Sequence, residues 1–264
     1  MQTKDLSLGV IDSGVGGLSV VRELQRVLPH ENIIFVSDSA NCPYGNLSAA
    51  QISSLTCRML SFLEEKKVKC TAVACNTIST LAEELRRQFA FPISSIVEAA
   101  TQLVMRENLE CVGLIATEFT VKSGKYQQLL RNGHSNCRII AKGSPLLAAL
   151  IEHRDLYPMQ IQREICDTVD AILAQESLSD LILGCTHYPL VSDIFTACYP
   201  QLRLIDPAAE QAQSLRTMLS QKGLLSECEQ GTLSIYTTGD PKVYADLCVR
   251  LGIGHIKTIE KVQL

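Results

Sequence analysis

Short apolar runs alternate with amphipathic stretches along the whole chain. Runs of three to six apolar or small residues predict strands at 6–14, 32–38, 69–75, 92–97, 110–117, 137–143, 180–185, 203–206 and 233–239. Between them, apolar positions recur every three or four residues, as in the first such stretch: Leu18, Val21, Leu24, Val27 and Leu28. This spacing predicts helices at 17–28, 48–67, 79–89, 123–132, 145–153, 157–175, 189–199, 207–223 and 240–253. Strands that alternate with helices indicate parallel sheets with covering helices, an α/β protein.

Polar side chains gather where the predicted strands end. They are Asp12 with Ser13, Ser37 with Asp38, Cys75 with Asn76 and Thr77, Thr117 with Thr120, and Cys185 with Thr186 and His187. Open α/β sheets bind ligands at the carboxyl ends of their strands. The sequences VACNT (73–77) and LGCTH (183–187) are also weakly alike. We therefore predict two similar α/β domains with largely parallel sheets that face one another across an active-site cleft.

Composition excludes several classes of function. The chain has 264 residues, a formal net charge of −4 and no strongly basic segment, which argues against a nucleic-acid partner. No apolar run is long enough to cross a membrane, and residues 1–10 lack the apolar stretch of a signal peptide, so a cytoplasmic location is expected. The eleven cysteines include no CxxC pair and the five histidines are isolated, so no metal site is predicted from spacing.

Cys75 and Cys185 differ from the other cysteines because each ends an apolar strand. A helix beginning at that point would favour the thiolate through its dipole. Each could be a buried structural residue, and Cys185 with His187 could form the nucleophile of a hydrolase. Two opposed thiols would instead suit removal of a proton from one face of a carbon and its return to the other.

The glycine-rich turn DSGVGG (12–17) also allows two interpretations. It could be a tight connection from strand to helix, or it could bind an anion through backbone N–H groups. It lacks the GK[ST] ending of a nucleotide loop. In the second interpretation, Asp12 and Ser13 project into a site where these donors hold a carboxylate.

Taken together, several motifs resemble those of the cofactor-independent glutamate racemases in the aspartate/glutamate racemase superfamily. They are GVIDSGVGGLSVVREL, SDSANCPYG, VACNTIS, LGCTHYPL and YTTGDPKVYADLCVRLG, and the resemblance extends from about Ser7 to Gly252. It implies one domain of residues 1–97 plus 208–264 and a second of 98–207. It also implies interconversion of L- and D-glutamate without a cofactor, a supply of D-glutamate for peptidoglycan, the bacterial cell wall and cell shape, and a homodimer.

The resemblance assigns roles to individual residues. Cys75 would act on the α-hydrogen of D-glutamate and Cys185 on that of L-glutamate. Asp12 would assist Cys75, His187 would assist Cys185, and Glu152 matches a further carboxylate of the family. Residues that match substrate-binding positions are Ser13, Pro43, Tyr44, Gly45, Asn76, Thr77, Thr117, Thr120 and Thr186.

The chain also departs from the family pattern. Asn41 stands where arginine is usual, Gly143-Ser144-Pro145 replaces a Cys-Pro form, and Ile78 follows CNT where a small residue is commoner. These changes bear on substrate choice, so a racemase for aspartate or another amino acid is an alternative. A Cys-His hydrolase and a non-catalytic amino-acid-binding protein are further ones. Because the chain starts close to its first strand, the regulation by a cell-wall precursor found in some longer members is not expected.

Overall fold

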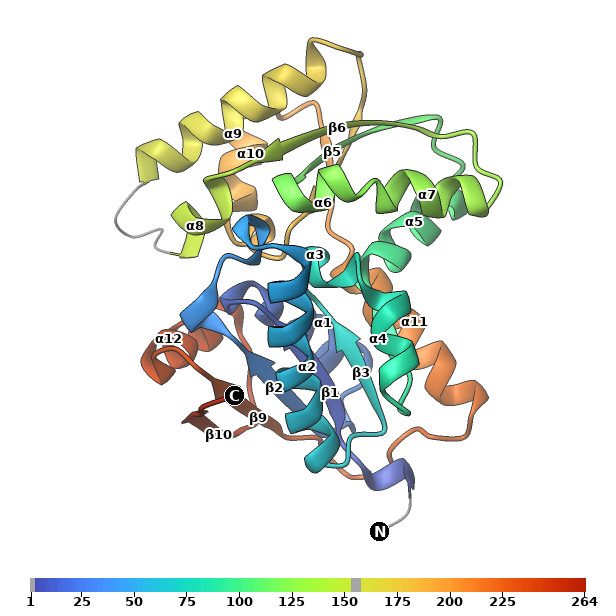
Figure 1. Cartoon of the computed structure of the whole chain (residues 1–264), viewed down its shortest axis with the longest axis vertical. Coiled ribbons are helices and arrows are strands. Elements are labelled where there is room, and N and C mark those ends of the chain that lie inside the picture. The colour runs from blue at the N-terminus through green and yellow to red at the C-terminus, as the bar shows by residue number, and fades with distance from the viewer. Residues whose placement is uncertain (1–2, 153–157) are drawn as a thin grey trace.

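The chain folds into two fully parallel sheets, which confirms the predicted α/β class. The computed structural model describes residues 3–152 and 158–264 (Figure 1). The six-stranded sheet has the order β10-β9-β2-β1-β3-β4 and the four-stranded sheet the order β6-β5-β7-β8. The strands of the first sheet are β1 Leu8–Asp12, β2 Ile33–Ser37, β3 Cys70–Val73, β4 Ile93–Ser95, β9 Leu233–Thr237 and β10 Ile256–Lys261. Those of the second are β5 Cys111–Thr117, β6 Arg138–Ser144, β7 Asp180–Gly184 and β8 Arg203–Ile205.

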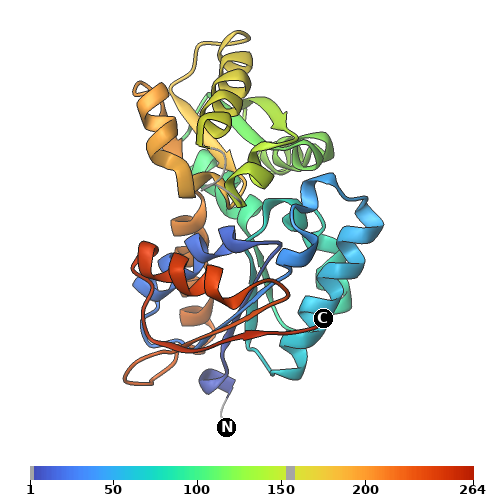
Figure 2. The same cartoon turned by 90° about the vertical axis from the view of Figure 1, so that its left-hand side faces the viewer.

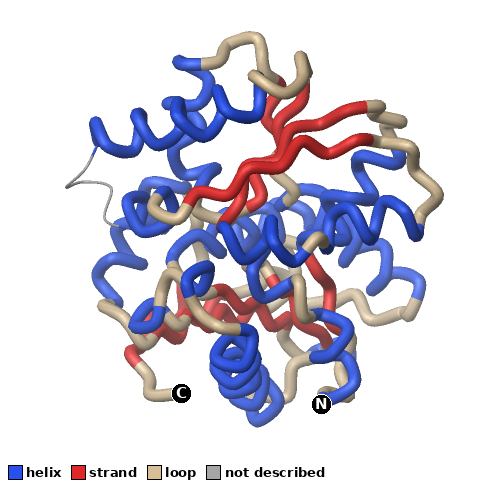
Figure 3. Tube along the Cα trace, turned by 45° about the horizontal axis from the view of Figure 1, so that its top comes forward, coloured by secondary structure: helices blue, strands red, loops and turns tan. Residues whose placement is uncertain are grey.

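Helices surround both groups of strands (Figure 3). The α-helices are α1 Leu18–Val27, α2 Ala49–Glu65, α3 Asn76–Ser79, α4 Ala82–Gln88, α5 Ile96–Arg106, α6 Glu118–Ser123, α7 Lys125–Asn132, α8 Leu147–Glu152, α9 Pro158–Leu173, α10 Ser192–Cys198, α11 Ala208–Gln221 and α12 Pro241–Leu251. The short 3₁₀ helices are η1 Thr3–Asp5, η2 Val15–Gly17, η3 Ser39–Asn41, η4 Tyr44–Asn46 and η5 Tyr188–Val191. His153 and Tyr157, which the sequence placed in helices, lie outside the described residues.

Several elements were not predicted, among them the helices α3, α5 and α6 and the strand β10. Helix α5 begins at Ile96, inside the segment 92–97 that the sequence assigned wholly to a strand, and continues to Arg106. Ser95 caps it by accepting a hydrogen bond from the Glu98 backbone N–H, 3.4 Å away. Strand β10 lies at the edge of its sheet, and its side chains are exposed or half-buried throughout. A strand without a buried face gives no alternating apolar signal.

The chain crosses between the two sheets twice, through α5 and α11. One hydrophobic core includes residues of both crossings, such as Val97 and Ala212, together with Val10 of β1 and Leu114 of β5. The side view shows the four-stranded sheet above the six-stranded one, with both chain ends in the lower part (Figure 2). The two sheets are therefore joined by a shared core in addition to the connecting backbone.

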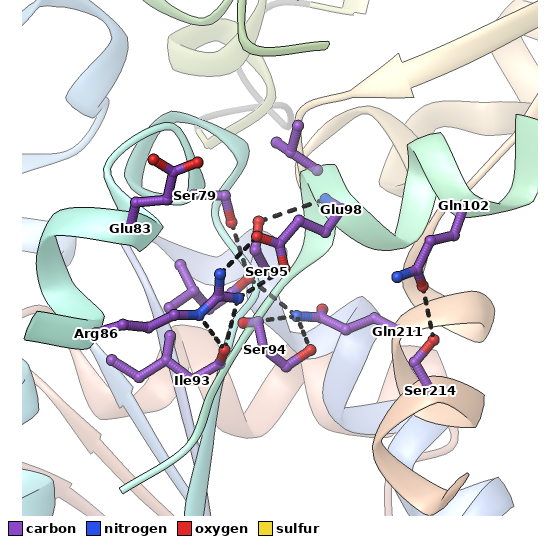
Figure 4. Close-up of polar contacts among 12 residues, drawn as sticks. Ser79, Glu83, Arg86, Ile93, Ser94, Ser95, Glu98, Gln102, Gln211 and Ser214 are labelled. Carbon is purple, nitrogen blue, oxygen red and sulfur yellow. Dashed lines mark hydrogen bonds and ion pairs between the residues drawn. The ribbon is translucent and has the colours of Figure 1, made fainter. Parts of the chain in front are cut away.

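Polar contacts bind the two crossings to the six-stranded sheet (Figure 4). Arg86 on α4 forms a two-pronged ion pair with Glu98 on α5, with both N–O distances at 2.6 Å. Gln211 on α11 is fully buried and donates to the carbonyl oxygens of Val73 and Ser94, at 3.1 and 3.3 Å. These contacts fix the orientation in which α5 leaves the sheet and α11 returns to it.

Candidate active site

In each sheet the strand order reverses around one central strand, and the two points of reversal face the same cavity. In the six-stranded sheet β1 lies between β2 and β3, and in the four-stranded sheet β5 lies between β6 and β7. Ligands of open α/β sheets bind at such points. The residues that line the cavity are Ser13, Pro43, Tyr44, Gly45, Cys75, Asn76, Thr77, Thr117, Ala148, Cys185, Thr186 and His187. Eleven of these twelve were predicted site residues; only Ala148 was not.

Cys75 lies directly after β3, at the start of the single-turn helix α3. Its Sγ is 3.5 Å from the hydroxyl of Ser13, which comes from the end of β1. The helix start favours the thiolate as predicted, since a hydrogen bond from the Ile78 backbone N–H lowers the pKa of Cys75, but this local effect does not decide the outcome. Burial, together with the negative charge of Asp12, raises the pKa of the Cys75 thiol to about 12 and outweighs the hydrogen bonds that stabilise the thiolate.

Cys185 lies on the opposite side of the cavity, after β7. No helix begins beside it, contrary to the prediction, because the next helical turn starts only at Tyr188. Its Sγ is 3.7 Å from Nδ1 of His187, and Nε2 of the same ring is 2.6 Å from Oε2 of Glu152. The sequence therefore identified a row of three groups, thiol, imidazole and carboxylate, although Glu152 belongs to a separate element, α8.

Burial and hydrogen bonding have opposite effects on the pKa values of His187 and Glu152. Burial alone would lower the pKa of His187, but its hydrogen bonds with Cys185, Cys42 and Glu152 raise it well above the usual range. Burial would raise the pKa of Glu152, but the hydrogen bond and charge of His187 lower it below its usual value. The pair therefore favours an imidazolium beside a carboxylate.

Asp12 connects the two sides of the cavity. It is fully buried, and its carboxylate accepts hydrogen bonds from the Gly14 backbone N–H at 2.9 Å and from the Thr186 hydroxyl at 3.0 Å. Burial raises the pKa of Asp12 to about 6, although the positive charge of His187 and these hydrogen bonds act in the opposite direction. Asp12 is thus ionised at neutral pH but close to its titration range.

Hydroxyl and amide groups form the rest of the lining. The hydroxyl oxygens of Thr77, Thr117 and Thr120 lie within 3.0 to 3.3 Å of one another. Asn76 accepts a hydrogen bond from the Tyr126 hydroxyl at 2.7 Å, while its buried Nδ2 has no hydrogen-bond partner among the described residues. An unsatisfied buried amide donor beside a cavity is costly unless a ligand completes it.

The cavity itself is narrow. It measures about 10 Å³, roughly the room that one water molecule needs. Glycines allow the two sheets to approach so closely: a Cβ at Gly45 would lie 2.6 Å from Cβ of Thr117, and one at Gly16 would lie 2.6 Å from the Thr186 carbonyl carbon. The cavity is therefore a narrow space between the loops of the two sheets.

The positions that depart from the family pattern lie around the cavity. Asn41 is exposed and donates to both carboxylate oxygens of Asp38, at 3.1 and 2.9 Å. Ser144 accepts a hydrogen bond from the Leu147 backbone N–H at 2.9 Å and so begins α8, the helix that carries Glu152. Ile78 is fully buried in the core below α3. None of the three lines the cavity.

Reasoning from the sequence missed two contributors to the site. Ser39 donates to Oε1 of Glu152 at 3.3 Å, and the Tyr244 hydroxyl lies 2.5 Å from the hydroxyls of both Ser37 and Ser39. Tyr244 belongs to α12, more than 200 positions after Ser37, so no local pattern could have indicated it. Cys42 also contacts this row of groups, because its Sγ is 3.9 Å from Nε2 of His187.

Fold and site define a two-sheet α/β protein with paired cysteines on opposite sides of one closed cavity. The chain belongs to the Asp/Glu/Hydantoin racemase family, whose sequence model matches residues 8–215. It is 38% identical to a glutamate racemase of Stutzerimonas stutzeri, with 89% of each chain covered. It is 34% identical to one of Limosilactobacillus reuteri, with 89% of this chain and 88% of the relative covered.

Solved structures agree with this family. A glutamate racemase isoform from Bacillus anthracis matches with a TM-score of 0.91 at 29% identity, over 99% of this chain and 98% of the other. The Francisella tularensis glutamate racemase, solved in complex with D-glutamate, matches with a TM-score of 0.86 at 29% identity over 98% of both chains. An aspartate racemase from Picrophilus torridus, 16% identical, shares the fold, with a TM-score of 0.62 over 82% of this chain and 94% of the other. No helix in the described part of the chain has the length and apolar character needed to cross a membrane.

Proposed function

We propose that this protein is a glutamate racemase that interconverts L- and D-glutamate with two cysteine thiols and no cofactor. The observation that carries the proposal is the placement of Cys75 and Cys185 at the ends of strands in different sheets, in the lining of one cavity. Similarity to glutamate racemases over almost the whole chain supports the choice of substrate.

The reaction needs one base and one acid on opposite faces of the α-carbon. With D-glutamate, the thiolate of Cys75 takes the α-proton, and the thiol of Cys185 gives its proton to the other face of the carbanion. With L-glutamate, the two cysteines exchange roles. Each turnover leaves one thiol protonated and the other deprotonated, so the pair returns to its starting state when a second, reverse event or proton exchange follows.

Neighbouring groups control the protonation of each thiol. Asp12, ionised at neutral pH, is the base that can receive the proton of Cys75, whose own pKa is too high for spontaneous ionisation. His187 contacts Cys185 directly and is held by Glu152, so an imidazolium there stabilises the thiolate or resupplies its proton. The resemblance of these residues to the family motifs supports the same assignment.

Binding groups must stabilise the carbanion because an α-proton is far less acidic than a thiol. Preorganised donors in a water-free site supply such stabilisation. We propose that the substrate carboxylates are held by the unsatisfied Nδ2 of Asn76 and by the buried hydroxyls of Ser13, Thr77, Thr117, Thr120 and Thr186. The PYG segment, Pro43 to Gly45, closes one wall. Since the closed cavity holds about one water, we propose that the two sheets separate to admit glutamate.

We further propose the division into residues 1–97 plus 208–264 and residues 98–207. All strands of the six-stranded sheet fall in the first set and all strands of the four-stranded sheet in the second. A role in supplying D-glutamate for peptidoglycan synthesis and cell shape follows from the proposed activity. The homodimer and the cytoplasmic location stay predictions from the sequence.

Isotope exchange tests the mechanism. The purified protein, without added cofactor, is incubated with each glutamate enantiomer in deuterium oxide while circular dichroism and α-deuterium incorporation are followed. Cys75→Ser and Cys185→Ser are compared with Cys70→Ser, a control at a buried cysteine of the core below the site. We expect both enantiomers to lose optical activity with the wild type and the control, and racemisation to be abolished in either site variant.

Two results would overturn the proposal. Racemisation that survives loss of one thiol would exclude the two-base mechanism. Exchange with aspartate but not with glutamate would place the protein among racemases for another amino acid.

A further inference from the structure

The fold brings together three groups that the sequence keeps far apart: the thiol of Cys42, the carboxylate of Glu152 and Nε2 of His187. Their donor atoms all lie within 4.8 Å of one another. The sulfur is 3.9 Å from Nε2, and Nε2 is 2.6 Å from Oε2 of Glu152. Thiolate, imidazole and carboxylate are the three ligand types that zinc binds in proteins.

The three atoms also point toward one place, next to Gly14. A methyl carbon built on Gly14 would lie 2.8 Å from the Cys42 sulfur, 2.8 Å from Oε2 of Glu152 and 3.1 Å from Nε2 of His187. Because residue 14 is glycine, no side chain fills this place. An ion near it would have all three donors as neighbours on one side.

Two of the three distances between donor atoms can be compared with those of a tetrahedral zinc site. With Zn–S near 2.3 Å and Zn–N near 2.0 Å, sulfur and nitrogen lie roughly 3.5 Å apart, and nitrogen and oxygen roughly 3.4 Å apart. The sulfur–nitrogen distance of 3.9 Å needs a change of about 0.4 Å. The nitrogen–oxygen distance of 2.6 Å must widen by about 0.8 Å as the ion replaces the proton between these atoms.

Neighbouring groups suit a bound cation. Ser39 and the Val15 backbone N–H hold the Glu152 carboxylate, at 3.3 and 3.4 Å, and so orient it as ligands in metal sites are oriented by a second layer of contacts. A surface hollow of about 120 Å³ reaches Glu152 from outside, between α12 and η5. Solvent can therefore reach the Glu152 carboxylate from this side.

We propose that this protein binds one zinc ion through Cys42, Glu152 and His187, and that the bound ion inhibits the reaction. The thiol of Cys42 and the ring at Nε2 release any protons they carry to solvent when the ion binds. The ion joins Cys42, which belongs to the part of the chain with the six-stranded sheet, to Glu152 and His187, which belong to the part with the four-stranded sheet. It therefore holds shut the cavity that must open to admit glutamate. The inhibitory part of this inference rests on the proposed racemase activity; the binding part does not.

Binding is measured on the full-length, metal-free, reduced protein. Zinc is titrated by calorimetry, and cobalt by absorption, because a cobalt–thiolate bond gives a charge-transfer band. We expect one site and a cobalt–thiolate band in the wild type. Cys42→Ser should weaken zinc binding by about 100-fold or more and remove the band. Cys57→Ser, a half-buried cysteine on α2, is the matched control and should bind as the wild type does.

The proposed catalytic thiols, Cys75 and Cys185, are the alternative place for zinc to bind. If Cys42→Ser binds zinc like the wild type, or if binding is lost in Cys185→Ser and retained in Cys42→Ser, the proposed site is wrong. Glu152→Gln gives a second test should Cys42→Ser fail to fold, and it should also weaken binding while retaining the cobalt–thiolate band.

The activity measurement separates the two proposals. Zinc should stop racemisation in the wild type over the same concentrations that fill the site, a chelator should restore it, and any activity of Cys42→Ser should be insensitive to zinc. Zinc binding at this site without loss of racemisation would overturn the inhibition. Absence of racemisation in the metal-free protein would overturn the proposed function while leaving the measured zinc site standing.

Discussion

At Gly16 the loops of the two sheets approach one another through backbone atoms, so Gly16→Ala tests whether catalysis depends on that approach. A Cβ there would lie 2.6 Å from the carbonyl carbon of Thr186 and 2.8 Å from the backbone nitrogen of His187. These are backbone atoms, which cannot turn away as a flexible side chain can. The loop after β1 and the loop after β7 must therefore separate.

The size of the separation follows from the contact. Ordinary van der Waals contact begins at 3.4 Å, so the loops must move apart by 3.4 minus 2.6, or 0.8 Å. The same movement would lengthen the Asp12–Thr186 hydrogen bond from 3.0 Å to about 3.8 Å, beyond hydrogen-bonding distance. A misplacement of this size costs about 100-fold in rate, and overpacking lowers the free energy of unfolding by about 1–3 kcal/mol.

The assay compares kcat for racemisation with the free energy of unfolding in urea. Gly254→Ala is the matched control, because a Cβ at Gly254 meets no atom within 4 Å, and both its kcat and its stability should equal those of the wild type. A Gly16→Ala variant that folds and keeps full kcat would refute the argument that the closed contact aligns Asp12 and Thr186.

Three further predictions concern other buried groups. Lys69→Met should lower the free energy of unfolding by about 3–5 kcal/mol, because it leaves the carboxylate of Glu31, its partner at 2.5 Å, buried without a cation, and adding Glu31→Gln should recover part of the loss in urea denaturation. In the wild type, the free energy of unfolding should fall by about 3 kcal/mol as pH rises from about 4 to about 6, because Asp12 ionises near 3.8 in the unfolded chain but near 6 in the folded one. Asp12→Asn should remove this fall. A slope equal to that of the wild type would contradict the raised pKa of Asp12. Tyr244→Phe removes the hydroxyl that holds Ser39 against Glu152, so kcat should fall about tenfold and the pH profile should shift; an unchanged pH profile would limit Tyr244 to packing.

The local sequence pattern was sufficient to predict most helices and strands and the two cysteines on either side of the site. The spacing of apolar residues indicated α1, and Ser48, the first residue of the predicted helix 48–67, caps α2 in a capping box completed by Gln51. Cys75 and Cys185 each follow the end of a strand, as the sequence indicated. These features are local because hydrogen bonding and side-chain direction repeat within a few residues.

The tertiary structure decided what surrounds those residues. The sequence could not show that Gly16 brings Asp12 to Thr186, or that Tyr244 completes a hydrogen-bonded row to Glu152 from the far end of the chain. Nor could it show that the pKa of Cys75 is raised overall, because burial depends on the packing of both sheets and exceeds the local effect of one helical turn.

The metal-ligand cluster shows the same division. Spacing along the chain gave no indication of zinc, since it contains no CxxC pair and the histidines are isolated, yet Cys42, Glu152 and His187 meet at Gly14. The amino-acid order therefore determined the strands, the helices and the residues at their ends. Only the packing of one parallel sheet against the other determined which of those ends share a site, because contacts between distant segments have no periodic signal in the sequence.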